Sequence, residues 1–146
     1  MLKLSTGLRN ALAVTGSLRD SLNNGFLRIY SGTVPASPDA ALGGAVLLCE
    51  ISAGGDGTPL TFEPTAQTGV LVKSVSENWT GNIQTGGTPT FFRLVAAADT
   101  GEASTEAPRI QGTAGGIGND MVISVLPMVE GTPQAFDLFR LAWPEQ

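Results

Sequence analysis

Short apolar segments bounded by turn-forming residues constrain this chain more than any other feature. From residue 25 onwards, runs rich in Val, Ile, Leu or Phe alternate with clusters of Gly, Pro, Asn and Thr. Runs of this kind predict β-strands, and the Gly and Pro between them predict turns. We expect about eight strands, at residues 26–31, 45–52, 60–63, 69–74, 88–97, 108–112, 121–126 and 134–143.

The order of these segments predicts an all-β fold. No helical pattern alternates with the strands, so βαβ units and a parallel sheet are not expected. The composition agrees, because 19 glycines and 9 prolines serve many turns and only 14% of the residues are charged. We expect a jelly-roll-like antiparallel β-sandwich of about eight strands with one N-terminal helix, and a barrel is the alternative.

Residues 5–23 are the one segment with a helical pattern. Its apolar positions recur at spacings of three and four residues, which places them on one helix face. These positions are Leu8, Ala11, Leu12, Thr15, Leu18 and Leu22. Ser5 or Thr6 can cap the start, and Gly25 suits the left-handed residue that follows a helix.

The expected domain organisation follows from this change of pattern. Residues 1–24 form an N-terminal arm and amphipathic helix, and residues 25–146 form the β-sandwich domain. A single helix of this length needs a surface to lie on. It either covers the sheet of its own domain or helps to clamp the protein to a partner.

Charge is unevenly distributed along the chain. Residues 1–28 carry four cations and one carboxylate, a net of +3, and the remainder carries four cations and twelve carboxylates, a net of −8; the sum is −5. A basic arm on an acidic body can dock onto a neighbour's acidic surface, including a second copy of the chain. The alternative is that few charges fall unevenly by accident. The sequence contains no cluster of basic residues large enough for nucleic-acid binding, so we expect no nucleic-acid partner.

The residues available for chemistry are few. The chain contains no histidine and one cysteine, Cys49, in the apolar run AVLLCEI. His-dependent catalytic triads are therefore impossible, one cysteine cannot build a zinc site, and we expect Cys49 to be a small buried hydrophobic residue. Glu102 and Glu106 flank a small polar stretch, which indicates a solvated loop and not a catalytic pair. We expect no enzyme activity, cofactor or metal.

No membrane or targeting segment is expected either. No run approaches the roughly 18 apolar residues of a membrane span. Lys3, Arg9 and Arg19 interrupt the apolar pattern of the N-terminal residues, whereas a signal peptide needs an unbroken apolar stretch. The single cysteine agrees with synthesis in a reducing cytosol.

Two features stand out as candidate contact sites. The loop at residues 33–44 is long and consists almost wholly of small residues and prolines, and long loops in compact domains are often binding elements. Trp79 lies among polar residues in SENWTGN, so we expect it to be partly exposed.

The stretch KLSTGLRNALAVTGSLRDSLNNGFLRIYSGTVPASPDAAL resembles the opening of a family of small structural proteins from tailed bacteriophages and prophages. The stretches ENWTGNIQTGGTPTFFRLVAAADTG and APRIQGTAG are similar to that family too, so the resemblance spans most of the chain. It implies a virion component, most simply a capsid cement or decoration protein. Proteins of this kind include jelly rolls that bridge capsomers on the outer shell. The family carries no active-site motif.

The resemblance also implies the partners and location. The expected partners are the major capsid protein and further copies of the chain, as a dimer or trimer. The expected location is the capsid exterior, after synthesis in the bacterial host cytoplasm. The candidate contact residues are Lys3, Arg9, Leu12, Arg19, Val34, Pro35, Pro38, Leu42 and Trp79. Two alternatives remain: a tail, baseplate or connector protein of the same virion, and a carbohydrate-binding module for the host surface.

Overall fold

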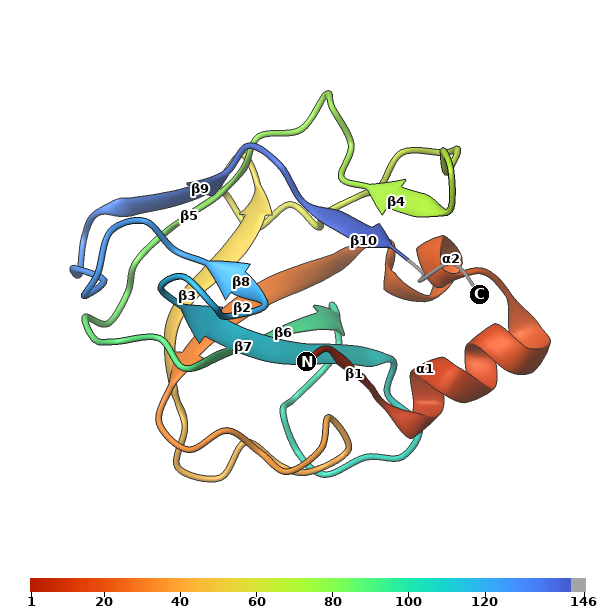
Figure 1. The fold of residues 1–146 in the computed structure, drawn as a ribbon, viewed down its shortest axis with the longest axis horizontal. Coiled ribbons are helices and arrows are strands. Elements are labelled where there is room, and N and C mark those ends of the chain that lie inside the picture. Colours follow the sequence, from red (N-terminus) through yellow and green to blue (C-terminus); the bar gives the residue numbers. More distant parts are fainter. Residues whose placement is uncertain (143–146) are drawn as a thin grey trace.

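The computed structural model describes residues 1–142, which contain ten strands and a broken N-terminal helical segment joined by turns and loops (Figure 1). The helical elements are α1 (Thr6–Asn10), η1 (Ala11–Thr15) and α2 (Leu18–Leu22). The strands are β1 (Lys3–Leu4), β2 (Gly25–Ser31), β3 (Val46–Ala53), β4 (Val70–Val72), β5 (Trp79–Asn82), β6 (Phe91–Ala96), β7 (Arg109–Gly115), β8 (Met121–Val122), β9 (Pro133–Phe136) and β10 (Arg140–Ala142). Trp143, the end of the strand expected at residues 134–143, lies outside the described residues.

The strands form one large sheet and one small one. The large sheet has the order β1-β7-β6-β2-β3-β5-β9, with β8 paired to β7, and the small sheet pairs β10 with β4. Neighbouring strands are antiparallel except for the β7–β8 pair. The predicted all-β fold with an N-terminal helical segment is confirmed, and its packing is sandwich-like.

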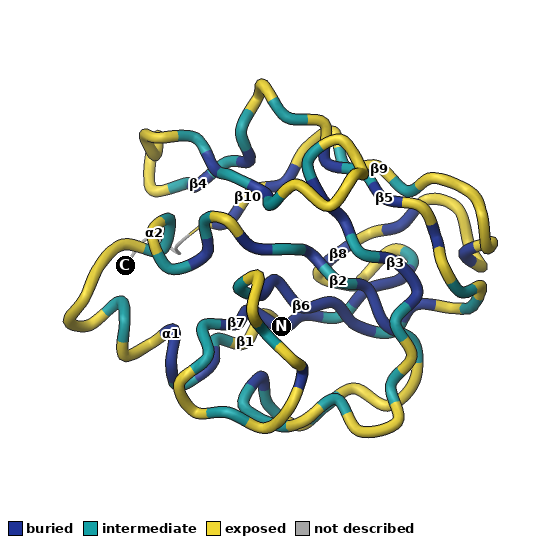
Figure 2. The backbone as a smooth tube through the Cα atoms, turned by 180° about the vertical axis from the view of Figure 1, so that it is seen from behind, coloured by how far each residue is buried: buried dark blue, intermediate teal, exposed yellow. Residues whose placement is uncertain are grey.

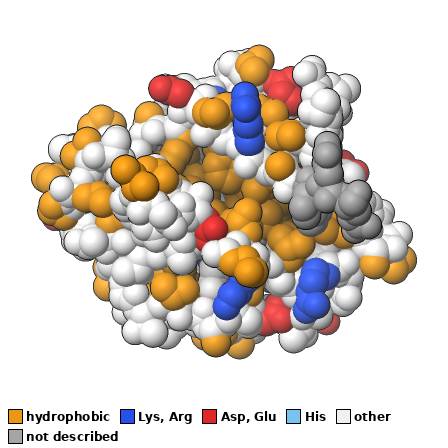
Figure 3. Space-filling view, viewed as in Figure 1, with side chains coloured by type: hydrophobic (Ala, Val, Ile, Leu, Met, Phe, Trp, Pro, Cys, Tyr) orange, Lys and Arg blue, Asp and Glu red, His pale blue; other side chains and the backbone are white. Residues whose placement is uncertain are grey.

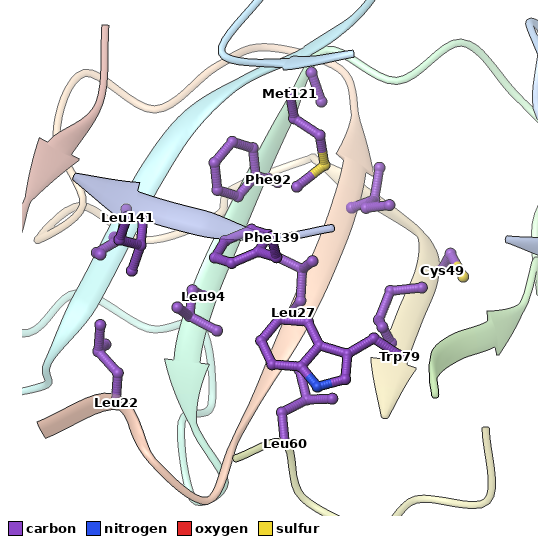
Figure 4. Packing of buried hydrophobic residues seen from close by; sticks show 14 of the residues in the cluster. Leu22, Leu27, Cys49, Leu60, Trp79, Phe92, Leu94, Met121, Phe139 and Leu141 are labelled. Carbon is purple, nitrogen blue, oxygen red and sulfur yellow. The ribbon is translucent and has the colours of Figure 1, made fainter. Parts of the chain in front are cut away.

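The two faces of the central strands differ in chemistry because side chains alternate along a strand. One face carries Leu27, Phe92 and Leu94, which belong to the main hydrophobic cluster. Figure 4 shows Phe139, just before β10, and Leu141, on β10, packed toward this face. The central strands are the most continuously buried part of the chain (Figure 2). The small sheet therefore closes one side of the core.

Several strand predictions need correction. Residues 60–63 form only isolated bridges, and residues 134–142 form two strands instead of one, because β9 pairs with β5 whereas β10 pairs with β4. Strands β1 and β5 were not predicted. The first has two residues, too few for a pattern, and the second reads WTGN, in which Gly and Asn are residue types depleted in strands.

The helix predicted at residues 5–23 is present, but its expected continuity is wrong, because three short helical elements occupy this segment. The Ser5 side chain caps α1 by accepting a hydrogen bond from Leu8 N at 3.1 Å. Ser17 caps α2 in the same way, accepting from Asp20 N at 3.0 Å, with an extended ψ of 165°. An N-cap residue is not helical, so the helix must end before Ser17 and restart after it. The break lets Leu8 and Leu22 both reach the core, where each is fully buried.

Residues 1–24 share the hydrophobic core of the β-domain. Strand β1 pairs with β7, and Leu8 and Leu22 belong to the same cluster as the strand residues. The Ser5 hydroxyl also donates to Ala107 O at 2.7 Å and accepts from Arg109 N at 2.9 Å. This segment is therefore built into the fold and does not extend from it.

Candidate partner-contact surfaces

A row of polar residues crosses the second face of the large sheet. In register, Glu50 of β3 lies opposite Arg28 of β2, Arg28 opposite Arg93 of β6, Arg93 opposite Gln111 of β7, and Gln111 opposite Lys3 of β1. Residues paired across strands point to the same face. The face that turns away from the core cluster therefore carries a continuous row of charged and amide side chains.

Arg93 lies at the centre of this row and is almost completely buried. Its Nε donates to Gln111 Oε1 at 2.9 Å, and its Nη2 donates to Ala40 O at 2.9 Å. Its Nη1 has no partner among the described residues. Burial, together with the nearby Arg109 charge, lowers the pKa of Arg93 below its ordinary value.

Arg109 forms the second buried anchor. Its Nε lies 2.5 Å from Asp99 Oδ2 and its Nη2 lies 3.1 Å from Asp99 Oδ1, so the pair is bidentate. The remaining donors reach Pro38 O at 2.9 Å and Glu102 O at 2.8 Å. A buried ion pair of this kind overcomes its desolvation cost only when the other donors are also satisfied. Here they are satisfied by the backbone of two loops.

The loop at residues 33–44, which we call the fastened loop, lies over this polar row (Figure 1, orange, bottom). Five of its carbonyl oxygens accept hydrogen bonds from the sheet: those of Pro35, Ala36, Ser37, Pro38 and Ala40. The donors are Gln111 Nε2 to Pro35, Lys3 Nζ to Ala36, Arg109 Nη1 to Pro38, and Arg93 Nη2 to both Ser37 and Ala40. Small side chains and prolines leave these carbonyls accessible, which explains the composition of the loop.

The fastened loop places its four candidate contact residues differently. Val34 is exposed and Pro35 is half-buried, so both can meet a partner. Pro38 is buried, and Leu42 is half-buried with its backbone N–H bonded to Gly101 O at 3.0 Å. Pro38 and Leu42 therefore anchor the loop, and the outward surface consists of Thr33, Val34, Ala36, Ala41, Gly43 and Gly44.

The N-terminal candidate residues serve the fold to different degrees. Arg9 is exposed, and its Nη2 donates only to Thr6 Oγ1 at 2.9 Å. Leu12 is half-buried against the core. The Nε of Arg19 donates to the carbonyls of Phe62 and Glu63, at 3.2 and 2.9 Å. Among these three residues, Arg9 has the most exposed charged group.

The expectation that Trp79 is partly exposed is wrong, because its exposed fraction is 0%. Its ring packs edge-on against Phe62 with centroids 5.4 Å apart, and its Nε1 donates to Glu77 Oε2 at 2.9 Å. The polar neighbours in SENWTGN thus include the acceptor that a buried indole needs. Trp79 supports the core and cannot act as a platform for a sugar ring.

Sequence reasoning missed an apolar surface on and after β8. It consists of Val122, Val125, Leu126, Val129 and Leu138, which are 40–70% exposed. Orange side chains gather over this part of the chain (Figure 3, left). The missed signal is in MVISVLPMV, where apolar residues occupy both faces of a segment that the sheet can cover on one face only. Exposed apolar patches of this kind mark protein–protein contacts.

A groove of about 520 Å³ lies near the N-terminal strand, lined by Met1, Leu2, Leu4, Leu18, Ile110, Asp120, Leu141 and Ala142. Among these lining residues Asp120 is the only one with a carboxylate side chain, and it accepts hydrogen bonds from Met1 N and Thr113 N. One carboxylate that is already engaged does not make an acid–base pair.

Cys49 is fully buried, as predicted. Within residues 1–142, no three or more Cys, Asp or Glu side chains come together in a way that could hold a metal ion. None of the helices in this part of the chain has the length and apolarity to cross a bilayer. Comparison with known proteins finds no match to this chain among family models, curated proteins or solved structures.

Proposed function

We propose that this chain is a structural protein of a tailed-bacteriophage virion, a capsid cement or decoration protein that binds the capsid exterior and bridges major capsid subunits. The sequence resemblance to phage structural proteins is the source of the virion assignment. The observation that carries a binding role is the fastened loop, which two buried arginines hold against the sheet.

The fastened loop suits docking because its shape is set before binding. A loop that is already ordered loses little conformational entropy when a partner covers it. Its exposed residues are small, so they also lose little side-chain entropy on contact. The exposed Val34 supplies an apolar contact at its surface.

The anchors favour a defined shape over stability. Two guanidinium groups are almost completely removed from water, and apolar residues of similar volume often stabilise a fold equally well or better. The arginines do what apolar residues cannot, since their fixed donors select particular carbonyls of the loop. A protein that works by surface shape benefits from that selection.

The cement role follows from mass action and symmetry. A protein that binds the assembled shell, and not its separated subunits, stabilises the shell. The shell repeats one subunit, so a single surface can occupy many equivalent sites. On this account the protein acts by binding and performs no catalysis.

The test is decoration of phage heads that lack this protein, with the bound copies counted by quantitative electrophoresis and located in particle images. Val34→Asp should reduce occupancy about tenfold at a fixed protein concentration, because it places a charge in the proposed contact. Val75→Asp is the matched control, since Val75 is 83% exposed and lies outside the fastened loop. Full occupancy by the Val34→Asp protein would reject the loop as the contact. Antibody labelling on the tail alone would reject the capsid placement and favour a tail or connector protein.

A further inference from the structure

The β-domain carries little exposed positive charge. Between residues 29 and 142 the sequence contains four cations, of which Lys73, Arg93 and Arg109 are buried and Arg140 is exposed. Arg140 lines a groove together with Val122 and Leu138 of the apolar surface. Beside Val125 and Val129 the nearest charged residue in sequence is the exposed Glu130, and no cation occurs between residues 110 and 139. Two copies that met through Val125 and Val129 would therefore bring like charges together.

The complementary chemistry lies in the N-terminal helical segment. Val14 is 88% exposed, at the end of η1, and Arg9 is exposed at the end of α1. The nearby carboxylate of Asp39 already accepts hydrogen bonds from Thr6 N and Thr6 Oγ1, at 2.8 and 2.7 Å. We call residues 9–15 the helical corner. It offers one apolar side chain and one cation with free donors.

The two surfaces lie on opposite sides of the molecule. In Figure 1 the helical corner is at the right, and the connection between β8 and β9 is at the left. A contact between different surfaces on opposite sides is heterologous, so successive copies join head to tail and close into a ring when the rotation allows it.

We propose that copies of this chain associate head to tail, with the helical corner of one copy covering the apolar surface of the next. Val14 packs against Val125 and Val129, and Arg9 pairs with Glu130 or Asp137. The contact is both apolar and charged, so it weakens with salt but is not abolished by it. This inference deepens the proposed function by naming the surfaces through which copies would meet.

The first test is sedimentation velocity of the purified full chain over a range of concentrations, at about 50 mM and about 500 mM salt. We expect the mean mass to rise with concentration, and to rise less at the higher salt. Val14→Asp and Val129→Asp should each weaken association about tenfold or more. Val75→Asp should leave it unchanged, because that exposed valine belongs to neither surface. A chain that stays monomeric at all concentrations would overturn the inference.

Mixing the two variants distinguishes head-to-tail from symmetric association. A Val14→Asp copy keeps its apolar surface and a Val129→Asp copy keeps its helical corner, so the mixture should form one-to-one dimers that do not grow further. A symmetric contact through the apolar surface predicts normal association of the Val14→Asp protein alone, and in the mixture no dimers other than those that the Val14→Asp protein forms with itself. That outcome would refute the proposal.

Charge exchange tests the ion pair. Arg9→Glu and the double variant Glu130→Arg/Asp137→Arg should each weaken association, and the triple variant should recover most of it. No recovery would show that Arg9 does not face these carboxylates. All three experiments use protein without virions, so failure here leaves the capsid assignment untouched, and failure of decoration leaves self-association untouched.

Discussion

Arg109 and Asp99 form a bidentate ion pair in which the two side chains are only 2% and 1% exposed. The pair joins β7 to the segment after β6, and the same guanidinium holds Pro38 O of the fastened loop. One buried charge therefore connects two neighbouring segments of the chain to the fastened loop, which is 71 positions away at Pro38. Removing the Asp99 carboxylate would leave the Arg109 charge buried without a counterion.

We expect Asp99→Asn to destabilise the fold strongly. Breaking a buried pair from one side costs about 3–5 kcal/mol, because the remaining charge stays desolvated. Urea denaturation followed by tryptophan fluorescence measures the loss. Glu106→Gln is the control, since an exposed carboxylate outside every proposed contact should change stability by no more than about 0.5 kcal/mol. A loss below about 1 kcal/mol for Asp99→Asn would mean that Arg109 finds another acceptor or water.

Gln111→Ala should loosen the fastened loop. The amide accepts from Arg93 Nε and donates to Pro35 O, so its removal leaves both groups without a partner. Leaving buried polar groups unsatisfied costs about 1–3 kcal/mol. Hydrogen exchange should become faster at residues 33–44, whereas exchange in β2 should change only as global stability does. Gln134→Ala provides the control, because its amide bonds only to the neighbouring Ala135 O. Unchanged exchange across the loop would contradict the anchoring role.

Gly81→Ala should be severely destabilising. A Cβ at this position would lie 2.1 Å from Glu50 O, a backbone atom of the neighbouring strand that cannot move aside easily. Overpacking of this kind costs about 1–3 kcal/mol and at times more. Thermal unfolding of Gly44→Ala is the comparison, since nothing lies within 4 Å of a Cβ there. Similar melting temperatures for the two variants would show that β5 can shift away from β3.

The Cys49 thiol should be unreactive in the folded chain. Burial first, and the neighbouring Glu50 charge second, raise its pKa from 9.0 to about 11. Because the folded-state pKa is the higher one, this thiol contributes stability below pH 9, and the contribution is lost as the pH rises from 9.0 to about 11. Iodoacetamide at about pH 8 should modify the chain in denaturant but not in its absence.

The Cys49→Ala variant checks the linkage. Its unfolding free energy should fall less steeply with pH between 9.0 and about 11 than that of the unchanged chain. Rapid alkylation of the folded protein would show that the thiol is accessible. Identical slopes of unfolding free energy against pH for the two proteins would show that the pKa of the thiol is not raised by folding.

The sequence by itself determined the fold class and the central strands. Apolar runs bounded by Gly and Pro predicted strands that overlap β2, β3, β6 and β7, because strand propensity and turn chemistry act over a few residues. The burial of Cys49 followed from the same local signal. The position of the helical segment was also predictable, but its break at Ser17 was not, since a serine can sit inside a helix or cap one.

Only the tertiary structure decided which polar residues are buried and which apolar ones are exposed. Trp79 is buried because Phe62 and Phe139 cover it and Glu77 accepts its N–H. Arg93 and Arg109 are buried because loop carbonyls some 50 to 70 positions away satisfy their donors. The run after β8 is exposed because the sheet covers one of its faces only. Burial depends on segments that meet from distant parts of the chain, and no local pattern carries that information.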